Sequence, residues 1–296
     1  MVTRPPIHVP AVWILLFALL LSGCSPLVLV NALVPDEGYA AETGIAYGPL
    51  ERHKLDLYRP TVPAPSKTVV VYLYGGAWTS GARGHYRFAG EAFASLGHLT
   101  VVPDYRLYPE ARFPAFVEDA ALALAWVRDS IAGHGGDPDR IVLVGHSAGA
   151  HIAALLALDR RYLATAGVPA RSIAGLVGLA GPYSFDPTRY RSTRKIFATA
   201  ATADDARPVS FAHPGAPPTL LLHGSDDGTV KPSNSAEMAA ALTAAGVEVR
   251  YEVLPEVGHT GILLALAAPL RDRATVLEEI AVFIKDLERD RAAVTN

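Results

Sequence analysis

The sequence of 296 residues contains a single cysteine. One cysteine cannot form an intrachain disulfide, and it cannot supply the thiolate cluster of a structural zinc site. A large excess of charge of one sign is also lacking, because the sequence has 26 Lys and Arg residues and 29 Asp and Glu residues, for a net charge of −3. Nucleic-acid-binding proteins usually carry a strongly basic face, so we expect no nucleic-acid partner.

Motifs for metals and nucleotides are missing as well. The sequence has no H-E-x-x-H pair, no G-x-x-x-x-G-K-[ST] loop and no G-x-G-x-x-G fingerprint, so we expect no metal and no other cofactor. Gly and Pro number 25 and 23, too few for a low-complexity chain, and half of the residues are apolar. This length and composition fit one large α/β domain with an ample core.

The N-terminus has the pattern of an exported lipoprotein. Arg4 precedes an unbroken apolar run over residues 11–21, which ends at Leu21-Ser22-Gly23-Cys24. A short basic stretch, an apolar segment of this length and small residues at its end are typical of an export signal. The last four residues resemble the lipobox of bacterial lipoproteins, which implies that residues 1–23 are a signal peptide and that Cys24 is lipidated. We therefore expect attachment to a membrane of the bacterial cell envelope, on its periplasmic or extracellular face.

An uncleaved membrane anchor is the alternative, because weaker apolarity continues through residues 26–30. Against it, Ser22, Gly23 and Ser25 interrupt the stretch, and a spanning helix needs about 20 predominantly apolar residues. After Cys24, we expect residues 24–48 to be a tether that leads into a folded domain.

From residue 49 to residue 291 the chain is predicted to be one domain in which strands and helices alternate. Runs of apolar and β-branched residues predict buried strands at 68–74, 99–102, 141–144, 173–179, 219–222 and 247–253. Helical spacing of apolar residues predicts helices at 116–131, 148–158, 233–245 and 274–288. Residues 53–58 alternate polar with apolar, as an edge strand half in water does. This order indicates an α/β fold with a mostly parallel sheet and helices on both faces.

Residues 184–214 interrupt the alternation. The stretch is irregular and carries four basic residues, Arg189, Arg191, Arg194 and Lys195. We interpret it as a short lid insertion. A solvated face explains its charges more simply than a preference for anionic substrates.

The segment Gly145-His146-Ser147-Ala148-Gly149 stands between a buried strand and an alanine-rich helix. This is the G-x-S-x-G pattern of a nucleophile elbow, in the strand–turn–helix context that such an elbow requires. Small flanking residues are needed because the turn is strained and leaves the Ser147 hydroxyl exposed. The helix start beside it offers N–H groups to a developing negative charge. An ordinary glycine-containing turn is the alternative.

A second segment, Tyr74-Gly75-Gly76-Ala77-Trp78, follows an earlier buried strand. Its two glycines allow the backbone to approach a ligand closely. Together with the elbow it resembles the H-G-G-G/A-W segment of the lipase and esterase families within the α/β-hydrolases. That resemblance implies an oxyanion hole made by the backbone N–H groups of Gly76, Ala77 and Ala148. Tyr74 departs from the pattern, because these families have a histidine there.

The expected partners of the serine follow in the order of this fold, acid and then histidine. His259 lies after the last predicted strand, and an ordinary imidazole, with a pKa near ~6.5, accepts a proton at physiological pH. The acid should follow the preceding strand, where residues 223–230 resemble the H-G-x-x-D-x-x-V segment of the family. This implies Asp227, with Asp226 as the alternative because spacing does not separate neighbouring acids in a loop.

Two other groups are expected to be structural. His151 lies one helical turn beyond the elbow and should point away from it. Asp104-Tyr105-Arg106-Leu107, with Pro109-Glu110, resembles another stretch of these esterases, including relatives of hormone-sensitive lipase. We expect its charged residues to form a structural ion-pair network.

The resemblance covers about residues 55–287 and implies an α/β-hydrolase fold. The implied activity is that of a serine hydrolase, which cleaves small-molecule carboxylic esters through an acyl-enzyme. Because the elbow is also similar to those of kynurenine-formamidase-like and feruloyl-esterase-like hydrolases, an aryl-formamide or other amide hydrolase is the alternative. A catalytically silent envelope lipoprotein is the alternative from another class. No motif specifies the substrate or the oligomeric state.

Overall fold

The computed structural model describes residues 26–61 and 66–295. The expected signal peptide and the expected lipidation site at Cys24 lie outside these residues. Within them, no helix has the length and apolar character needed to cross a bilayer.

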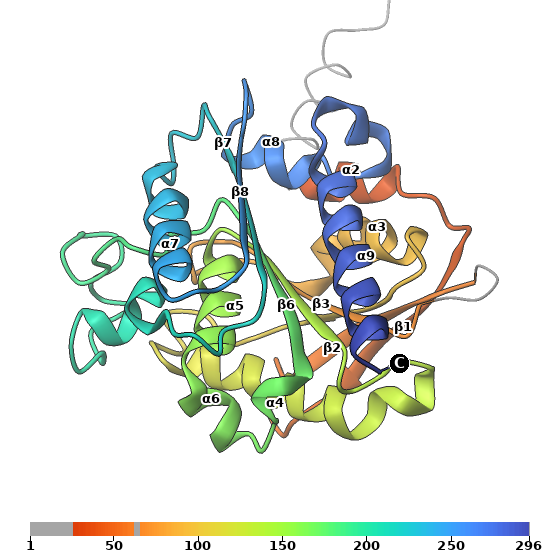
Figure 1. Ribbon diagram of the computed structural model, residues 1–296, viewed down its shortest axis with the longest axis horizontal. Coiled ribbons are helices and arrows are strands. Elements are labelled where there is room, and N and C mark those ends of the chain that lie inside the picture. Colours follow the sequence, from red (N-terminus) through yellow and green to blue (C-terminus); the bar gives the residue numbers. More distant parts are fainter. Residues whose placement is uncertain (1–25, 62–65, 296) are drawn as a thin grey trace, which may run out of the picture.

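An eight-stranded sheet forms the centre of the molecule, in the order β1-β2-β4-β3-β5-β6-β7-β8 (Figure 1). The strands are β1 (Tyr39–Ala46), β2 (Lys54–Pro60), β3 (Val69–Leu73), β4 (Leu99–Pro103), β5 (Ile141–His146), β6 (Ile173–Leu179), β7 (Thr219–Gly224) and β8 (Val249–Leu254). β2 pairs antiparallel with both β1 and β4, and every other neighbouring pair is parallel. The predicted mostly parallel sheet is confirmed.

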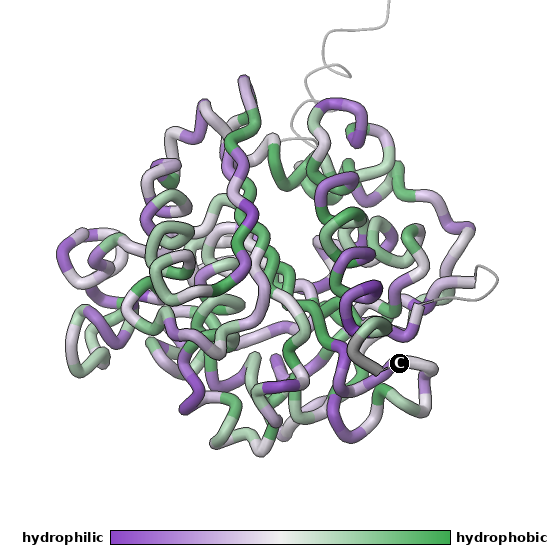
Figure 2. Tube along the Cα trace, viewed as in Figure 1, coloured by the Kyte–Doolittle hydropathy of each residue, from purple (hydrophilic) through white to green (hydrophobic). Residues whose placement is uncertain are grey.

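Helices cover both faces of this sheet. Those of the described chain are α2 (Pro26–Ala32), α3 (Arg87–Ser95), α4 (Ala115–Ser130), α5 (Ala148–Leu158), α6 (Arg160–Thr165), α7 (Ser233–Ala244), α8 (His259–Leu264) and α9 (Val276–Thr295). In Figure 1, α3 and α9 lie on one side of the sheet, and α4, α5 and α7 lie on the other. The central strands β3, β5 and β7 are buried along their whole length, and Figure 2 shows hydrophobic residues concentrated there. Apolar side chains on both faces of a strand are what a doubly covered parallel sheet needs.

The predicted tether over residues 24–48 is wrong for the part that the structure describes. Residues 26–32 form α2, and β1 pairs with β2 from Tyr39 opposite Pro60 to Ala46 opposite Lys54. The folded domain therefore begins well before residue 49. All eight β1 residues are exposed or half-buried, so this strand has no apolar alternation by which it could be recognised.

The predicted edge strand at residues 53–58 is also wrong in its position. β2 lies between β1 and β4, and five of its seven residues are buried. Because β1 covers its outer edge, β2 is an inner strand.

Residues 184–214 form the irregular insertion that the sequence predicts, with two short 3₁₀ turns at Asp204–Ala206 and Pro208–Phe211. The insertion packs on the domain: the Phe113 N–H donates to Ile196 O at 2.9 Å, and Phe197 is buried against Phe113 and Phe116. Its function as a lid stays a prediction.

Candidate active site

The nucleophile elbow joins β5 to α5. Ser147 has φ 54° and ψ −121°, a backbone conformation that residues other than glycine rarely adopt. Glycine flanks it because there is no room for more: a Cβ on Gly145 would lie 2.5 Å from Gly149 O, and one on Gly149 would lie 2.0 Å from Leu73 O. This crowding fixes Ser147 at the tip of the turn.

The structure brings Ser147, His259 and Asp227 together. His259 Nε2 lies 2.9 Å from Ser147 Oγ, and His259 Nδ1 lies 2.7 Å from Asp227 Oδ2. The serine hydroxyl can therefore donate to Nε2 while the Nδ1–H donates to the carboxylate. Asp226 instead is exposed and accepts a hydrogen bond from Ser225 Oγ at 2.8 Å, so only Asp227 of the two candidate acids meets His259.

Asp227 is buried and saturated with donors. Its Oδ1 accepts from the N–H groups of Thr229 and Val230, each at 2.8 Å. Burial raises the pKa of Asp227, but the hydrogen bond from His259 and those from the backbone outweigh it, so the pKa lies below its ordinary value. The carboxylate is thus kept charged beside the histidine.

His223 supports Asp227 from behind. Its Nε2 donates to Val230 O at 2.9 Å and lies 3.2 Å from Asp227 Oδ2, while its Nδ1 accepts from Ser235 Oγ at 2.7 Å. Burial lowers the pKa of His223, which favours the neutral ring. His223 opens the motif over residues 223–230, but the motif did not predict that this histidine contacts Asp227.

His146 supports the other partner. Its Nε2 donates to the backbone oxygen of His259 at 3.0 Å, and the two ring centroids lie 4.8 Å apart. Burial lowers the pKa of His146 to about 3, so the ring is neutral. His151, by contrast, is buried and donates to Ala206 O at 2.8 Å, and its ring packs edge-on against Trp78 of the predicted oxyanion loop, so its expected structural role stays a prediction.

The predicted oxyanion loop lies against the elbow in a strained conformation. Gly76, Ala77 and Trp78 have φ angles of 131°, 51° and 59°. The N–H groups of Thr79 and Ser80 both donate to Gly76 O at 3.0 Å and close the turn. A Cβ on the neighbouring Gly75 would lie 3.1 Å from Ser147 Cβ, so the loop approaches Ser147 closely. Ala148, the third expected donor, opens α5, where an N–H group has no partner within the helix.

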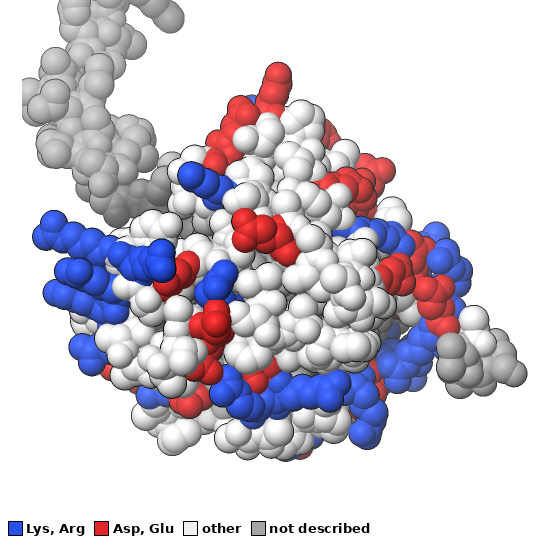
Figure 3. Space-filling model, turned by 60° about the vertical axis from the view of Figure 1, so that its left-hand side comes forward, with Lys and Arg blue, Asp and Glu red and all other residues white. Residues whose placement is uncertain are grey.

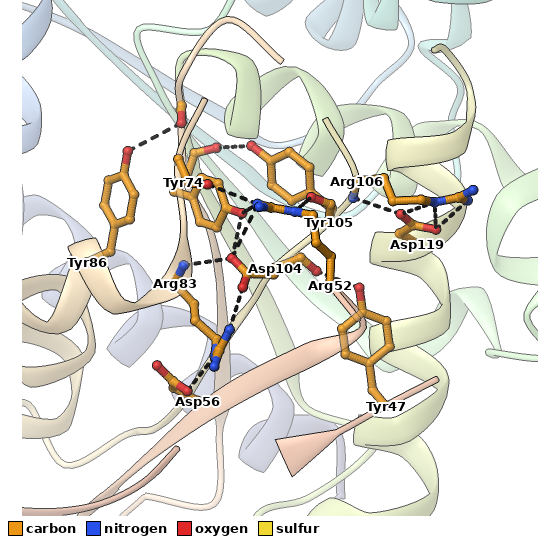
Figure 4. A network of polar contacts seen from close by, with 12 residues as sticks. Tyr47, Arg52, Asp56, Tyr74, Arg83, Tyr86, Asp104, Tyr105, Arg106 and Asp119 are labelled. Carbon is orange, nitrogen blue, oxygen red and sulfur yellow. Dashed lines mark hydrogen bonds and ion pairs between the residues drawn. The ribbon is translucent and has the colours of Figure 1, made fainter. Parts of the chain in front are cut away.

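Tyr74 holds this loop through a buried polar network (Figure 4). Its hydroxyl donates to Asp104 Oδ1 at 2.7 Å and accepts from Arg52 Nη2 at 3.0 Å. Arg52 also donates to Gly81 O at 2.9 Å, and the Tyr74 ring stacks between Tyr86 and Tyr105. The phenol thus occupies the place of the family's histidine with fixed partners of its own.

The predicted ion-pair network is confirmed for Asp104 and Arg106. Arg83 Nη1 lies 2.5 Å from Asp104 Oδ2, and Arg106 Nη2 lies 2.7 Å from Asp119 Oδ1. Glu110 is exposed. Neither pair contacts Ser147, and of the two only the Arg83–Asp104 pair reaches Tyr74, through the hydrogen bond of its hydroxyl to Asp104.

Comparison with known proteins identifies the family of the chain. The BD-FAE family model matches residues 55–242, a span that includes the oxyanion loop, the elbow and Asp227. The chain belongs to the BD-FAE family. This BD-FAE chain is 36% identical to Esterase LipQ of Mycobacterium tuberculosis, over 84% of its own length and 63% of that protein. It is 34% identical to the probable isoprenylcysteine alpha-carbonyl methylesterase ICMEL1 of Oryza sativa subsp. japonica, over 84% and 64%. It therefore spans a little under two thirds of these relatives.

Solved structures agree on the fold. Esterase B from Lactobacillus rhamnosis superimposes with a TM-score of 0.78 at 19% identity, over 96% of this chain and 98% of that one. The esterase 2 of Thermogutta terrifontis gives a TM-score of 0.69 at 22% identity, over 86% and 96%. The BD-FAE chain thus has the α/β-hydrolase fold that its sequence predicted.

Proposed function

We propose that this BD-FAE protein is a carboxylic ester hydrolase that works through an acyl-enzyme intermediate. The observation that carries the proposal is the hydrogen-bonded series from Ser147 Oγ through His259 to Asp227. It is supported by the names of the relatives, which include esterases from Mycobacterium tuberculosis and methylesterases from plants.

In the first step, Ser147 Oγ attacks the acyl carbonyl carbon while its proton moves to His259 Nε2. Asp227 accepts from Nδ1 throughout, so it holds the imidazole in the tautomer that leaves Nε2 free and then stabilises the imidazolium. His259 next gives its proton to the leaving alcohol. Water resolves the acyl-enzyme by the same steps, with His259 again acting as base and then as acid.

Backbone N–H groups are proposed to stabilise the negative charge that develops on the carbonyl oxygen. The N–H groups of Gly76, Ala77 and Ala148 are proposed to donate to it, and one such donor is typically worth about 10²–10³-fold in turnover. A backbone donor requires no particular side chain, which agrees with a loop built from glycine and alanine.

We also propose that the protein is tethered to a bacterial membrane through Cys24 after removal of residues 1–23. The lipobox-like Leu21-Ser22-Gly23-Cys24 supports this. Growth with labelled palmitate should label the wild type and not Cys24→Ala. Label that persists in Cys24→Ala would refute the lipid attachment, and a signal sequence that stays on the protein would favour the uncleaved anchor.

A fluorophosphonate probe tests the enzyme itself. It should label the folded wild type and not Ser147→Ala, and the substitution should lower ester turnover at least about 10⁴-fold. The substrates are esters of increasing acyl length, acetylated and feruloylated sugars, N-formylkynurenine and, because relatives bear that name, a prenylcysteine methyl ester. Faster turnover of N-formylkynurenine than of every ester would favour the amide hydrolase. A folded wild type that neither labels nor hydrolyses any substrate would favour the silent lipoprotein.

A further inference from the structure

The helix that opens the described chain presents an apolar surface to solvent. The described residues expose seven large apolar side chains, and three of these, Val28, Leu29 and Leu33, fall within six residues. They are 43%, 51% and 65% exposed. No charged residue occurs from Pro26 to Pro35. Single exposed apolar side chains are common on proteins, whereas a cluster of this kind marks a surface that another partner covers.

The exposure of these side chains does not mean that α2 is detached from the domain. Asn31 fastens α2 to the domain, because its Nδ2 donates to Gly84 O at 2.9 Å and its Oδ1 accepts from the Phe88 N–H at 3.1 Å. Leu27 and Val30 already pack on the core. The helix has therefore buried one face and still exposes the other.

The helix lies near the active site. It packs on the 3₁₀ turn Arg83–Tyr86, and the Tyr86 hydroxyl in that turn lies 3.3 Å from Gly75 O in the oxyanion loop. One short turn therefore separates α2 from the loop beside Ser147. In Figure 1, α2 lies in the upper half of the molecule, as does α8, which begins at His259.

Sequence distance identifies what covers this face. Cys24 stands two residues before Pro26, and two residues span at most about 7 Å. Acyl chains on Cys24 would hold α2 at the bilayer surface, where exposed apolar side chains enter the boundary between headgroups and acyl chains. Because no charged residue occurs from Pro26 to Pro35, apolar contact rather than charge provides the attraction at α2. The face of the molecule that Figure 3 shows differs, because Lys and Arg side chains gather at its left and lower edges.

We infer that α2, with Leu33 directly after it, is an interfacial segment that inserts Val28, Leu29 and Leu33 into the membrane and keeps the active site close to the bilayer. This inference rests on the proposed lipid anchor and deepens the proposed activity. The substrates that it favours are esters dissolved in the bilayer.

The single cysteine makes the insertion measurable. Once Cys24 is acylated, Leu33→Cys supplies the only free thiol for an environment-sensitive fluorophore, and Leu50→Cys is the matched control. Leu50 is 41% exposed, in the turn between β1 and β2. In vesicles of phosphatidylethanolamine and phosphatidylglycerol, nitroxide-labelled lipid should quench the label at residue 33 at least threefold more than at residue 50. Equal quenching in protein that incorporates labelled palmitate would overturn the inference and leave the anchor standing. Absence of palmitate would remove the anchor itself.

Activity gives a second readout. For Leu29→Asp/Leu33→Asp, the ratio of turnover on a vesicle-borne ester to turnover on a water-soluble ester should fall at least tenfold. Leu50→Asp should leave this ratio within twofold of the wild type. An unchanged ratio in the double variant would overturn the inference. So would a dimer of the unlipidated Cys24→Ala protein that dissociates in the double variant, because a second copy would then cover α2.

Discussion

The oxyanion loop and the loops that carry Asp227 and His259 meet at Ser147, but different groups hold them. Arginine and aspartate side chains hold the oxyanion loop: Arg52 and Asp104 converge on the Tyr74 hydroxyl, and Arg83 pairs with Asp104 (Figure 4). On the other side, neutral histidines and backbone N–H groups hold the acid and the base. His223 lies against Asp227, and His146 donates to the backbone of His259.

This difference separates two kinds of sensitivity. An arginine–carboxylate pair keeps its charges across the whole range in which proteins normally work. A neutral histidine that donates from one nitrogen changes its hydrogen bonding and its charge when it is protonated. Because burial lowers the pKa values of His146 and His223, both rings stay neutral in the folded protein in mild acid, which acts on the acid–base side through the free energy of unfolding. Removal of a buried hydroxyl should disturb only the oxyanion side.

The largest effect should come from the acid–base side. Asp227→Asn should lower kcat about 10⁴-fold, because an amide cannot stabilise the imidazolium or enforce the right tautomer. Asp226→Asn is the matched control and should change kcat less than threefold, since Asp226 contacts Ser225 and not His259. Steady-state kinetics on a soluble ester decide the matter. A greater loss in the Asp226 variant would transfer the acid to that residue.

The backbone of the oxyanion loop comes next. Gly76→Ala should lower turnover and the rate of fluorophosphonate labelling about 10²–10³-fold, the usual effect of losing an oxyanion donor. Its Cβ would lie 2.1 Å from Ser80 O, at a φ of 131°, so the loop must move. Gly84→Ala is the control, because a Cβ there meets nothing within 4 Å. Similar rates in the two variants would show that the donors are elsewhere.

A smaller effect is expected from the network behind this loop. Tyr74→Phe should lower kcat about tenfold with little change in KM, because hydrogen bonds to charged groups are worth about 1.5–3 kcal/mol and Arg52 and Asp104 can still pair across the gap. Tyr72→Phe controls for the loss of a buried hydroxyl, since no described residue hydrogen-bonds to the Tyr72 hydroxyl. The affinity for a boronic acid inhibitor should fall together with kcat in the Tyr74 variant and not in the Tyr72 variant. A lower melting temperature of the Tyr74 variant with unchanged boronic acid affinity would show that Tyr74 is merely structural.

The smallest effect is a pH dependence of stability that comes from His146. In the unfolded chain, His146 has the ordinary histidine pKa of about 6.5, whereas in the folded protein its pKa is about 3. Stability is therefore lost as the pH falls below 6.5, by about 2 kcal/mol at pH 5 for this residue. Urea unfolding at pH 7 and pH 5 should show a correspondingly weaker dependence in His146→Gln. Parallel losses in the two proteins would contradict this account.

Local patterns carried most of what the sequence could predict. The helix over Ala148–Leu158 and the strand over Ile173–Leu179 were expected with the bounds that the structure shows, because each is a mostly apolar run next to clear turn residues. The elbow and His259 were recognisable for the same reason. Each is a short motif that follows a strand.

Features that depend on distant residues were not predictable in this way. The hydrogen bond from His146 to His259 O joins residues 113 apart, and the contact of Arg52 with Tyr74 joins residues 22 apart. The choice between Asp226 and Asp227 depends on how the loop turns, which adjacent positions in a sequence do not reveal. β1 was missed because an exposed strand has no apolar period.

That strand has a practical consequence for any shortened form of the protein. β1 supplies the hydrogen-bond partners along the outer edge of β2, whose Leu55 and Leu57 are buried. A chain that starts at residue 49 would leave this edge unpaired, and an unpaired apolar edge is a template for intermolecular β-sheet. Such a chain should self-associate and precipitate, whereas a chain that starts at Pro26 keeps β1 paired along the outer edge of β2.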